Sequence, residues 1–240
     1  MNTHSFKPLT HPAIWHAITD RRMGNLARHT GDDPRCVSQN RRQLARLFLP
    51  KRVPIVWMDQ VHGNRVVLVN RLPKRPPACD ALITRTPHLA LAVMVADCVP
   101  ILFFDPDRLA VGVAHAGWRG TLASIAAKTV QSMSQAFGSD PASIRVGIGP
   151  AIGGECYEVD EAVAAPWREQ LGERYLKQTT ADHWHLDLPG ANTDQLIAAG
   201  VKAENIERIN ICTHCDERFY SYRRGQERGR FAGVIALKRP

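Results

Sequence analysis

Residues 92–120 read A-V-M-V-A-D-C-V-P-I-L-F-F-D-P-D-R-L-A-V-G-V-A-H-A-G-W-R-G. This stretch contains two short apolar runs, 92–96 and 110–114, and Cys98 closely follows the first run while His115 follows the second. Apolar runs of this length and composition are typical of β-strands. The stretch therefore predicts two strands, each of which ends near a side chain that can bind a metal or react.

A third strand is predicted between these two. Residues 101–104 are continuously apolar, and the D-P-D sequence at 105–107 indicates a turn. In an up-down-up meander of three strands, the end of the first strand and the end of the third lie at one edge of the sheet. We therefore expect Cys98 and His115 to be neighbours in space.

Strands and helices alternate along the rest of the chain. Apolar runs predict further strands at 13–19, 54–58, 65–69, 80–84, 89–95, 144–148, 183–188, 206–211 and 231–237. Helical spacing and end signals predict helices at about 34–48, 121–137 and 192–199, and a further helix broken at Pro166. No linker divides the chain. We expect the α/β class, with mixed β-sheets flanked by helices in a single domain over residues 1–240.

The composition is that of an ordinary soluble globular protein, with 44% hydrophobic and 22% charged residues. No apolar run approaches the roughly 18 residues that cross a bilayer, and residues 1–12 lack the apolar core of a secretory signal. Six cysteines in 240 residues do not form a disulfide framework. We therefore expect a cytoplasmic protein with reduced thiols and no membrane partner.

The net charge of +8 permits an anionic partner. The basic residues form short scattered clusters, and no long basic run or basic-aromatic RNA signature is present. This pattern favours a solvated basic surface over a nucleic-acid face. We expect a small-molecule substrate and no nucleic-acid partner.

Three candidate ligands stand at predicted strand ends or loops: His62, Cys98 and His115. Two imidazoles and one thiolate suit Zn²⁺ in an open site whose fourth position takes water or substrate. The same set suits copper in a trigonal site. Asp97 is a candidate general base or a partner that orients a ligating histidine, and Arg119 is a candidate clamp for phosphate or carboxylate.

The residues alone leave simpler interpretations open. Cys98 can be a buried apolar thiol, His115 a core histidine, and Arg119 an ordinary residue at a helix start. The C-x-x-C pair of Cys212 and Cys215 lacks the second pair of a zinc ribbon, so we expect inert or ancillary thiols there. The glycine-rich loop at 149–154 matches neither a P-loop nor a dinucleotide fingerprint, so neither a nucleoside triphosphate nor NAD is indicated.

Several motifs resemble the laccase-domain family, also called YfiH-like, multicopper polyphenol oxidoreductase or peptidoglycan editing factor proteins. The resemblance covers nearly the whole chain, in order. The matching motifs are D-Q-V-H-G (59–63), A-D-C-V-P (96–100), A-H-A-G-W-R-G (114–120), G-P-A-I-G (149–153), Y-E-V (157–159), D-L (187–188), F-Y-S-Y-R-R (219–224) and G-R (229–230).

The resemblance implies a function and a site. It implies a mixed α/β fold like that of cysteine hydrolases, with zinc on His62, Cys98 and His115. It also implies phosphorolysis of adenosine, inosine, guanosine or methylthioadenosine to the base and a sugar 1-phosphate, together with deamination of adenosine. We assign catalysis to Cys98, Asp97 and Arg119, and substrate binding to four residues: Arg22, Gln60, Arg223 and Arg224.

One segment departs from the family pattern. The family usually carries a longer S-T-R-x-G-G-V-S segment near the N-terminus, whereas residues 19–27 here read T-D-R-R-M-G-N-L-A. Arg22 stands where the family arginine is expected, but the second glycine and the serine are absent. If this loop closes over the substrate, affinity or substrate range will differ here.

Two alternative functions follow from the family's other descriptions. Copper-dependent oxidation of polyphenols by a multicopper site needs many histidines, and this chain has ten histidines and a single H-x-H pair. An editing role in cell-wall metabolism would make the metal structural. Such a zinc normally has four protein ligands, and Cys156 or another thiol would have to supply the fourth.

Overall fold

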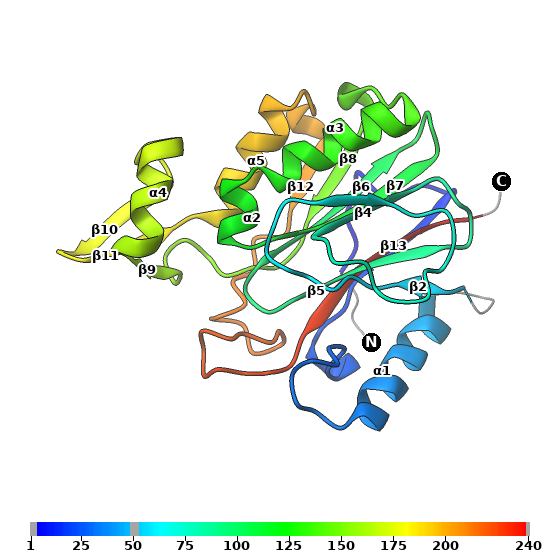
Figure 1. Ribbon diagram of the computed structural model, residues 1–240, viewed down its shortest axis with the longest axis horizontal. Helices are drawn as coiled ribbons and strands as arrows, with labels where there is room; N and C mark the ends of the chain where they lie inside the picture. Colours follow the sequence, from blue (N-terminus) through cyan, green and yellow to red (C-terminus); the bar gives the residue numbers. More distant parts are fainter. Residues whose placement is uncertain (1–3, 49–52, 239–240) are drawn as a thin grey trace.

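The computed structural model describes residues 4–48 and 53–238. Two mixed β-sheets pack face to face, with helices on the outer side of each (Figure 1). Helices α2 (Trp118–Leu122), α3 (Ile125–Phe137) and α5 (Leu188–Ala198) cover one sheet, and α1 (Pro34–Phe48) covers the other. The predicted class, mixed sheets flanked by helices, is confirmed.

The larger sheet has six strands in the order β12-β8-β6-β7-β4-β3. Their bounds are β12 (Ile206–Arg208), β8 (Arg145–Ile148), β6 (Val99–Asp105), β7 (Ala110–Ala116), β4 (Ala81–Thr84) and β3 (Val66–Leu68). The four-stranded sheet has the order β1-β13-β5-β2, with β1 (Ile14–Ile18), β13 (Phe231–Leu237), β5 (Ala90–Val95) and β2 (Ile55–Val56). Parallel and antiparallel pairs occur in both sheets.

Strand β6, in the middle of the larger sheet, is apolar on both faces because both faces are covered. In β6, Ile101 and Phe103 belong to the core beneath α3 and α5, whereas Leu102 and Phe104 belong to the core between the two sheets. This alternation follows from the two-residue period of a strand. It explains why the central stretch is continuously apolar instead of alternating with polar residues.

The predicted three-stranded meander is wrong. β5 does not pair with β6: it lies in the four-stranded sheet between β13 and β2, while β6 and β7 form an antiparallel hairpin in the other sheet. Asp97, with a φ of 81°, lies in the turn between β5 and β6, where the chain passes from one sheet to the other. Cys98 and His115 still meet, because Val99 pairs with Ala116 where β6 begins and β7 ends.

Two helix predictions also differ from the structure. The predicted helix at 121–137 is two helices, α2 and α3, separated at Ser124, whose φ of 60° is left-handed. α4 (Glu161–Leu171) runs through Pro166 without ending there, because packing of the fully buried Trp167 outweighs the loss of one helical hydrogen bond.

A smaller unit lies at one end of the molecule (Figure 1). It contains α4 and a three-stranded sheet, β10-β11-β9, made of β10 (Leu176–Thr180), β11 (His183–Leu186) and β9 (Glu158–Asp160). Three short 3₁₀ turns complete the described elements: η1 (Arg21–Met23), η2 (Pro141–Ser143) and η3 (Ala203–Asn205). Among the helices of 4–48 and 53–238, none combines the length and apolar character that crossing a bilayer requires.

Candidate metal centre and its cavity

The three predicted ligands lie together. His62 comes from the loop before β3, Cys98 from the turn before β6, and His115 from the end of β7. Their candidate ligand atoms all lie within 4.8 Å of one another. The two imidazole rings are nearly perpendicular, with centroids 4.7 Å apart. The structure therefore assembles the ligand set from three separate segments.

Asp80 orients the imidazole of His115 and holds the backbone at His62. Its carboxylate is fully buried, and Oδ1 lies 2.8 Å from Nδ1 of His115. The same carboxylate accepts hydrogen bonds from the backbone N–H groups of His62 at 2.9 Å and Gly63 at 2.7 Å. With Nδ1 engaged, His115 presents Nε2 to the ligand set. This carboxylate–histidine pairing is typical of metal sites.

The charges at the centre favour the thiolate. Burial alone would raise the pKa of the Cys98 thiol, but the adjacent His115 and hydrogen bonds with both imidazoles outweigh it and lower the pKa to about 6. Burial opposes the charge of His115, yet the Cys98 thiolate and Asp80 raise its pKa to about 9. Burial also opposes ionisation of Asp80, but bonds from His115 and Gly63 lower its pKa. A thiolate is the form that binds metals.

Gly117 leaves room beside the ligands. A Cβ at this position would lie 3.1 Å from Sγ of Cys98 and 3.2 Å from Cδ2 of His62. Its φ of −77° is open to any residue, so the glycine serves this close approach and not a special turn. Two imidazoles, one thiolate and a free fourth side fit the donor set of an open zinc site.

The centre forms one wall of a cavity of about 370 Å³. Three guanidinium groups line this cavity with the ligands: Arg119, Arg223 and Arg230. No carboxylate of residues 4–48 and 53–238 forms an ion pair with any of the three. The cavity is therefore positively charged beside the candidate metal centre.

Aromatic side chains form much of the remaining wall. Trp118, Tyr157 and Tyr222 all line the cavity. Arg119 lies over the ring of Trp118 at 4.3 Å from the centroid, and Arg223 lies over Tyr157 at 4.7 Å. The cavity thus combines flat apolar faces with positive charge, as a site for an aromatic, anionic ligand would.

Asp97 lines the cavity, but its carboxylate is engaged on both oxygens. Oδ1 accepts a hydrogen bond from Oγ1 of Thr213 at 2.7 Å, and Oδ2 accepts one from the backbone N–H of Arg223 at 2.8 Å. Its side chain is buried, and its backbone carbonyl accepts from Ile152 at 2.9 Å. Asp97 therefore connects three loops around the cavity.

Residues 19–238 match the family model described as "Multi-copper polyphenol oxidoreductase laccase". The chain belongs to this family. A purine nucleoside phosphorylase of Deinococcus radiodurans is 40% identical over 240 residues, which cover 95% of this chain and 90% of the relative. One from Corynebacterium glutamicum is 38% identical over 216 residues, covering 89% of this chain and 86% of the relative.

Solved structures of the laccase family share the fold. YlmD from Geobacillus stearothermophilus superposes with a TM-score of 0.88 at 34% identity, covering 98% of this chain and 94% of that chain. The YfiH protein of Bacillus licheniformis superposes with a TM-score of 0.87 at 32% identity, covering 97% of this chain and 100% of that chain. This chain therefore has the same fold as YlmD and the YfiH protein.

The predicted substrate-binding residues of this laccase-family chain divide into two groups. Gln60 and Arg223 line the cavity, although the Gln60 amide is held by the backbone of Met94 through bonds of 2.8 and 2.9 Å. Arg22 forms an ion pair with Asp20 and does not line the cavity.

Arg224 also lies outside the cavity lining. Its guanidinium forms an ion pair with Glu227 and donates to the carbonyls of Thr213 at 3.0 Å and Phe219 at 2.6 Å. These partners occupy its donors, so Arg224 holds the loop that carries Arg223.

The most consequential residue that the sequence prediction missed is Asp80. The sequence predicts only a strand at 80–84, whereas the structure buries the Asp80 carboxylate just before β4, an unusual position for a charged side chain. His29, Tyr157, Tyr222 and Arg230 line the cavity as well, and sequence reasoning gave them no role.

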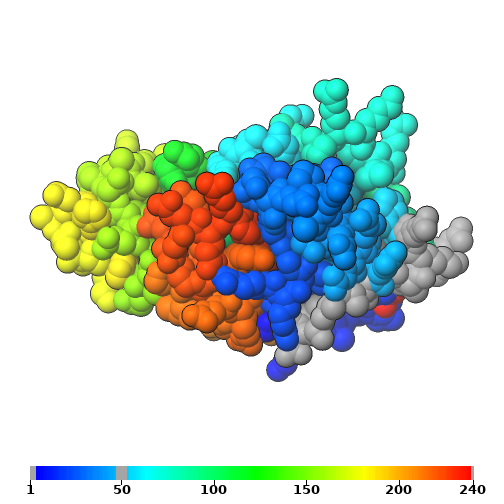
Figure 2. Space-filling model, turned by 90° about the horizontal axis from the view of Figure 1, so that it is seen from below, coloured from blue at the N-terminus to red at the C-terminus, as the bar shows by residue number. Residues whose placement is uncertain are grey.

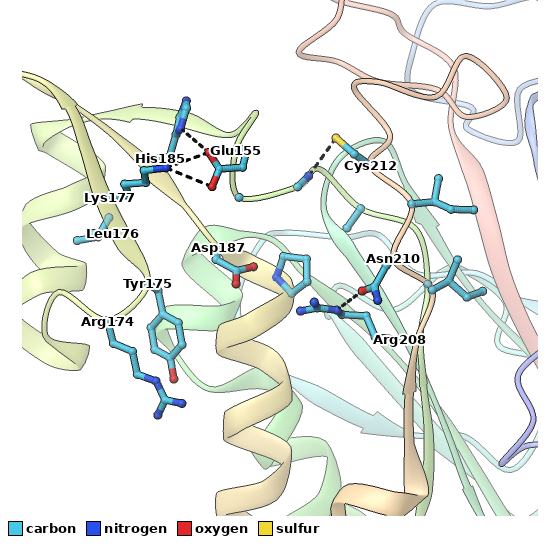
Figure 3. Close-up of a pocket in the computed structure, with 17 residues that line it drawn as sticks. Glu155, Arg174, Tyr175, Leu176, Lys177, His185, Asp187, Arg208, Asn210 and Cys212 are labelled. Atoms are coloured by element: carbon cyan, nitrogen blue, oxygen red, sulfur yellow. Dashed lines mark hydrogen bonds and ion pairs between the residues drawn. The ribbon is translucent and has the colours of Figure 1, made fainter.

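A second cavity, of about 430 Å³, lies beside β10, β11 and the 208–212 segment (Figure 3). Two of its lining cations are in ion pairs: Nζ of Lys177 lies 3.3 Å from Oε2 of Glu155, and Nη2 of Arg174 lies 2.9 Å from Oδ2 of Asp194. None of the three predicted ligands lines it. The smaller cavity is therefore the candidate functional site.

Proposed function

We propose that this protein is a zinc-dependent purine nucleoside phosphorylase that acts on adenosine, inosine, guanosine and methylthioadenosine. The observation that carries this proposal is the grouping of three guanidinium groups, Arg119, Arg223 and Arg230, in one cavity with the His₂Cys set, none of them in an ion pair with a carboxylate of residues 4–48 and 53–238. The names of the family relatives point to the same reaction.

The cavity supplies a binding site for each reactant. Guanidinium groups bind phosphate through paired hydrogen bonds, so Arg119 and Arg223 would hold the phosphate. The faces of Trp118, Tyr157 and Tyr222 would stack on the purine, as aromatic side chains do on bases. Each reactant thus has complementary groups within the same space.

Phosphorolysis places specific demands on these residues. A phosphate oxygen forms a bond to C1′ of the sugar while the bond from C1′ to the base nitrogen breaks, and the base leaves with the electron pair and takes up a proton. Fixing phosphate and nucleoside side by side lowers the entropic part of the barrier. The positive charge of Arg119 and Arg223 stabilises the phosphate as it transfers charge to the sugar.

A zinc ion held by His62, Cys98 and His115 would supply Lewis-acid polarisation at its open position. Asp80 would keep His115 in the tautomer that presents Nε2. Asp97 would position the loops that carry Arg223 and Thr213, because both of its oxygens already accept hydrogen bonds.

We also propose deamination of adenosine at this cavity. In this reaction water replaces the amino group at C6, and ammonia and inosine are the products. The same aromatic faces would hold the adenine ring, and the open side of the His₂Cys set beside Gly117 leaves space for its edge. Phosphate is not a reactant, so the two activities separate in an assay.

Copper-dependent oxidation of polyphenols remains the second candidate, because the family model carries that description. The ligand supply weighs against it: the candidate centre brings together two imidazoles and one thiol, whereas a multicopper centre needs many histidines. The editing role with a structural metal requires a fourth protein ligand. Cys156 is absent from the residues that line this cavity.

The test is a chromatographic assay of the zinc-loaded protein with adenosine, with and without phosphate. The proposal predicts adenine only when phosphate is present, and inosine regardless of phosphate. Cys98→Ala should abolish adenine release, while Cys36→Ser, at an exposed thiol of α1, should leave it unchanged. Absence of both products at full zinc occupancy would refute the purine assignment, and oxidation of a phenol by the copper-loaded protein would then favour the oxidase.

A further inference from the structure

A second group of side chains that could hold a metal ion lies apart from the cavity centre. Sγ of Cys156 lies 3.4 Å from Sγ of Cys215. Together with a ring nitrogen of His214, the candidate ligand atoms lie within 4.8 Å of one another. Cys156 and Cys215 are 59 residues apart in the sequence, so the fold and not local spacing brings them together.

Cys212 brings a third sulfur to the same loop, three positions before Cys215, and lies outside the group of ligand atoms that are all within 4.8 Å of one another. Its Sγ accepts a hydrogen bond from the backbone N–H of Gly153 at 3.2 Å, and Figure 3 marks this bond at the sulfur of Cys212. The sulfur is therefore directed at the loop that leads to Cys156.

Backbone hydrogen bonds hold the two loops in this arrangement. Ala151 and Cys212 form a parallel bridge, and the N–H of Cys156 donates to the carbonyl of Gly153 at 2.9 Å. The N–H groups of Cys215 and Asp216 donate to the carbonyl of Cys212 at 3.2 and 2.9 Å, which closes a tight turn. The group is therefore built on two loops fixed by their own backbones.

We propose that Cys156, Cys212, His214 and Cys215 form a second, structural zinc site. Three sulfurs and one imidazole are the donor set of a closed tetrahedral zinc site. Two sulfurs on one tetrahedral zinc, each about 2.3 Å from it, lie about 3.8 Å apart, close to the separation of Cys156 and Cys215. The C-x-x-C pair, expected to be inert thiols, thereby gains its missing ligands from a distant loop and from its own His214.

This site would support the candidate cavity without contacting its reactants. Tyr157, which follows Cys156, lines the cavity, and Thr213, between two of the ligands, holds Asp97. Arg224 donates to the carbonyl of His214 at 3.3 Å. The segment 212–230, orange to red, lies between the N-terminal region and the β9–β11 unit on the face shown in Figure 2. A zinc ion here would fix one wall of the cavity.

Zinc content by elemental analysis tests the proposal, with the thiols counted after denaturation. The wild-type chain, purified under reducing conditions with zinc, should hold two zinc ions and six free thiols. Cys215→Ser and Cys98→Ala should each hold about one zinc, the combined variant close to none, and Cys36→Ser two. The proposal would be overturned if the wild-type chain held only one zinc ion and Cys98→Ala held none. It would also be overturned if the wild-type chain had four free thiols instead of six, because that count indicates a disulfide between Cys156 and Cys215.

Cobalt substitution tests the site with the second cluster intact. In cobalt-loaded Cys98→Ala, the remaining site should show thiolate-to-cobalt absorption in the near ultraviolet and the visible bands of tetrahedral coordination. Absence of these bands in a folded sample, checked by circular dichroism, would overturn the proposal. Neither measurement depends on nucleoside turnover, so the second site stands or falls independently of the proposed phosphorylase activity.

Discussion

Oδ1 of Asp80 lies 2.8 Å from Nδ1 of His115, and the same carboxylate accepts the backbone N–H groups of His62 and Gly63. One buried carboxylate thus positions two of the three ligands at the candidate metal centre. The ligands themselves are at strand ends and in loops, where the backbone alone would not fix them. Asp80 therefore connects the fold to the chemistry of the site.

Replacing this carboxylate should weaken metal binding. Asp80→Asn keeps the side-chain shape but loses the charge that orients His115, and we expect zinc affinity to fall about 10- to 100-fold. Competition with a chromophoric chelator measures the affinity. The matched control is Asp105→Asn. Asp105 is also buried, but it lies at the end of β6 that is farther from Cys98, so this substitution should leave zinc affinity unchanged. Equal zinc affinity in Asp80→Asn and the wild type would contradict the orienting role.

Filling the space beside the ligands should also weaken the centre. In Gly117→Ala the added Cβ would approach Cys98 to 3.1 Å and His62 to 3.2 Å. Overpacking costs about 1–3 kcal/mol, which corresponds to roughly a 5- to 150-fold loss of zinc affinity. The same chelator competition applies. Gly225→Ala, whose Cβ would meet nothing within 4 Å, should bind zinc like the wild type; a parallel loss there would point to a general effect on folding.

Asp97 should act as a positioning residue and not as the general base. In Asp97→Asn one oxygen acceptor becomes an N–H₂ donor facing Thr213 or Arg223, and we expect kcat/KM for phosphorolysis to fall about tenfold or more. The shape of the pH profile of kcat should stay the same. Thr213→Val should also lower kcat/KM, and the double variant Asp97→Asn/Thr213→Val should lose less than the two single losses combined, because both substitutions break the same hydrogen-bond network. If the fall in kcat on the acidic side of the pH profile disappeared in Asp97→Asn, Asp97 would instead be the general base.

His16 should destabilise the fold in acid. Burial lowers its pKa to about 4, and its Nε2 accepts a hydrogen bond from the backbone N–H of Phe6, which only the unprotonated nitrogen can do. The unfolded chain binds a proton at its ordinary pKa of 6.5, so the stabilising contribution is complete above that pH. It is lost progressively as the pH falls toward 4, at a total cost of roughly 3 kcal/mol at most.

Urea unfolding at pH 7 and pH 4.5 measures this contribution. His16→Gln keeps a neutral acceptor for the Phe6 N–H and should lose less stability on acidification than the wild type does. His183→Gln, at an exposed position, should follow the wild type. An unchanged pH dependence in His16→Gln would mean that other groups account for the acid sensitivity.

The strand-end ligands could be predicted from sequence because their signal is local. Apolar runs that stop near Cys98 and His115 mark positions where a strand delivers a side chain to an edge. The predicted neighbourhood is correct, but the meander that led to it is not: β5 lies in the other sheet. Strands that are buried on both faces do not alternate apolar with polar residues, so the sequence does not reveal which strands pair.

The partners that support the site could not be predicted in the same way. Asp80 and His115 form a hydrogen bond although they are 35 residues apart in the sequence, and Asp97 and Thr213 do so although they are 116 residues apart. No periodicity encodes such pairs. Arg22 and Arg224 illustrate the converse, since their motif positions suggested substrate contact while the fold supplies each with a carboxylate partner.

The most direct test of the central proposal follows phosphate itself. The zinc-loaded protein is incubated with adenosine and inorganic phosphate and observed by ³¹P nuclear magnetic resonance. We predict a new ribose 1-phosphate resonance that grows in step with adenine release and is absent in Cys98→Ala. Adenine release with the phosphate resonance unchanged would identify a hydrolase, and no adenine release from the fully zinc-loaded protein would contradict the phosphorylase assignment.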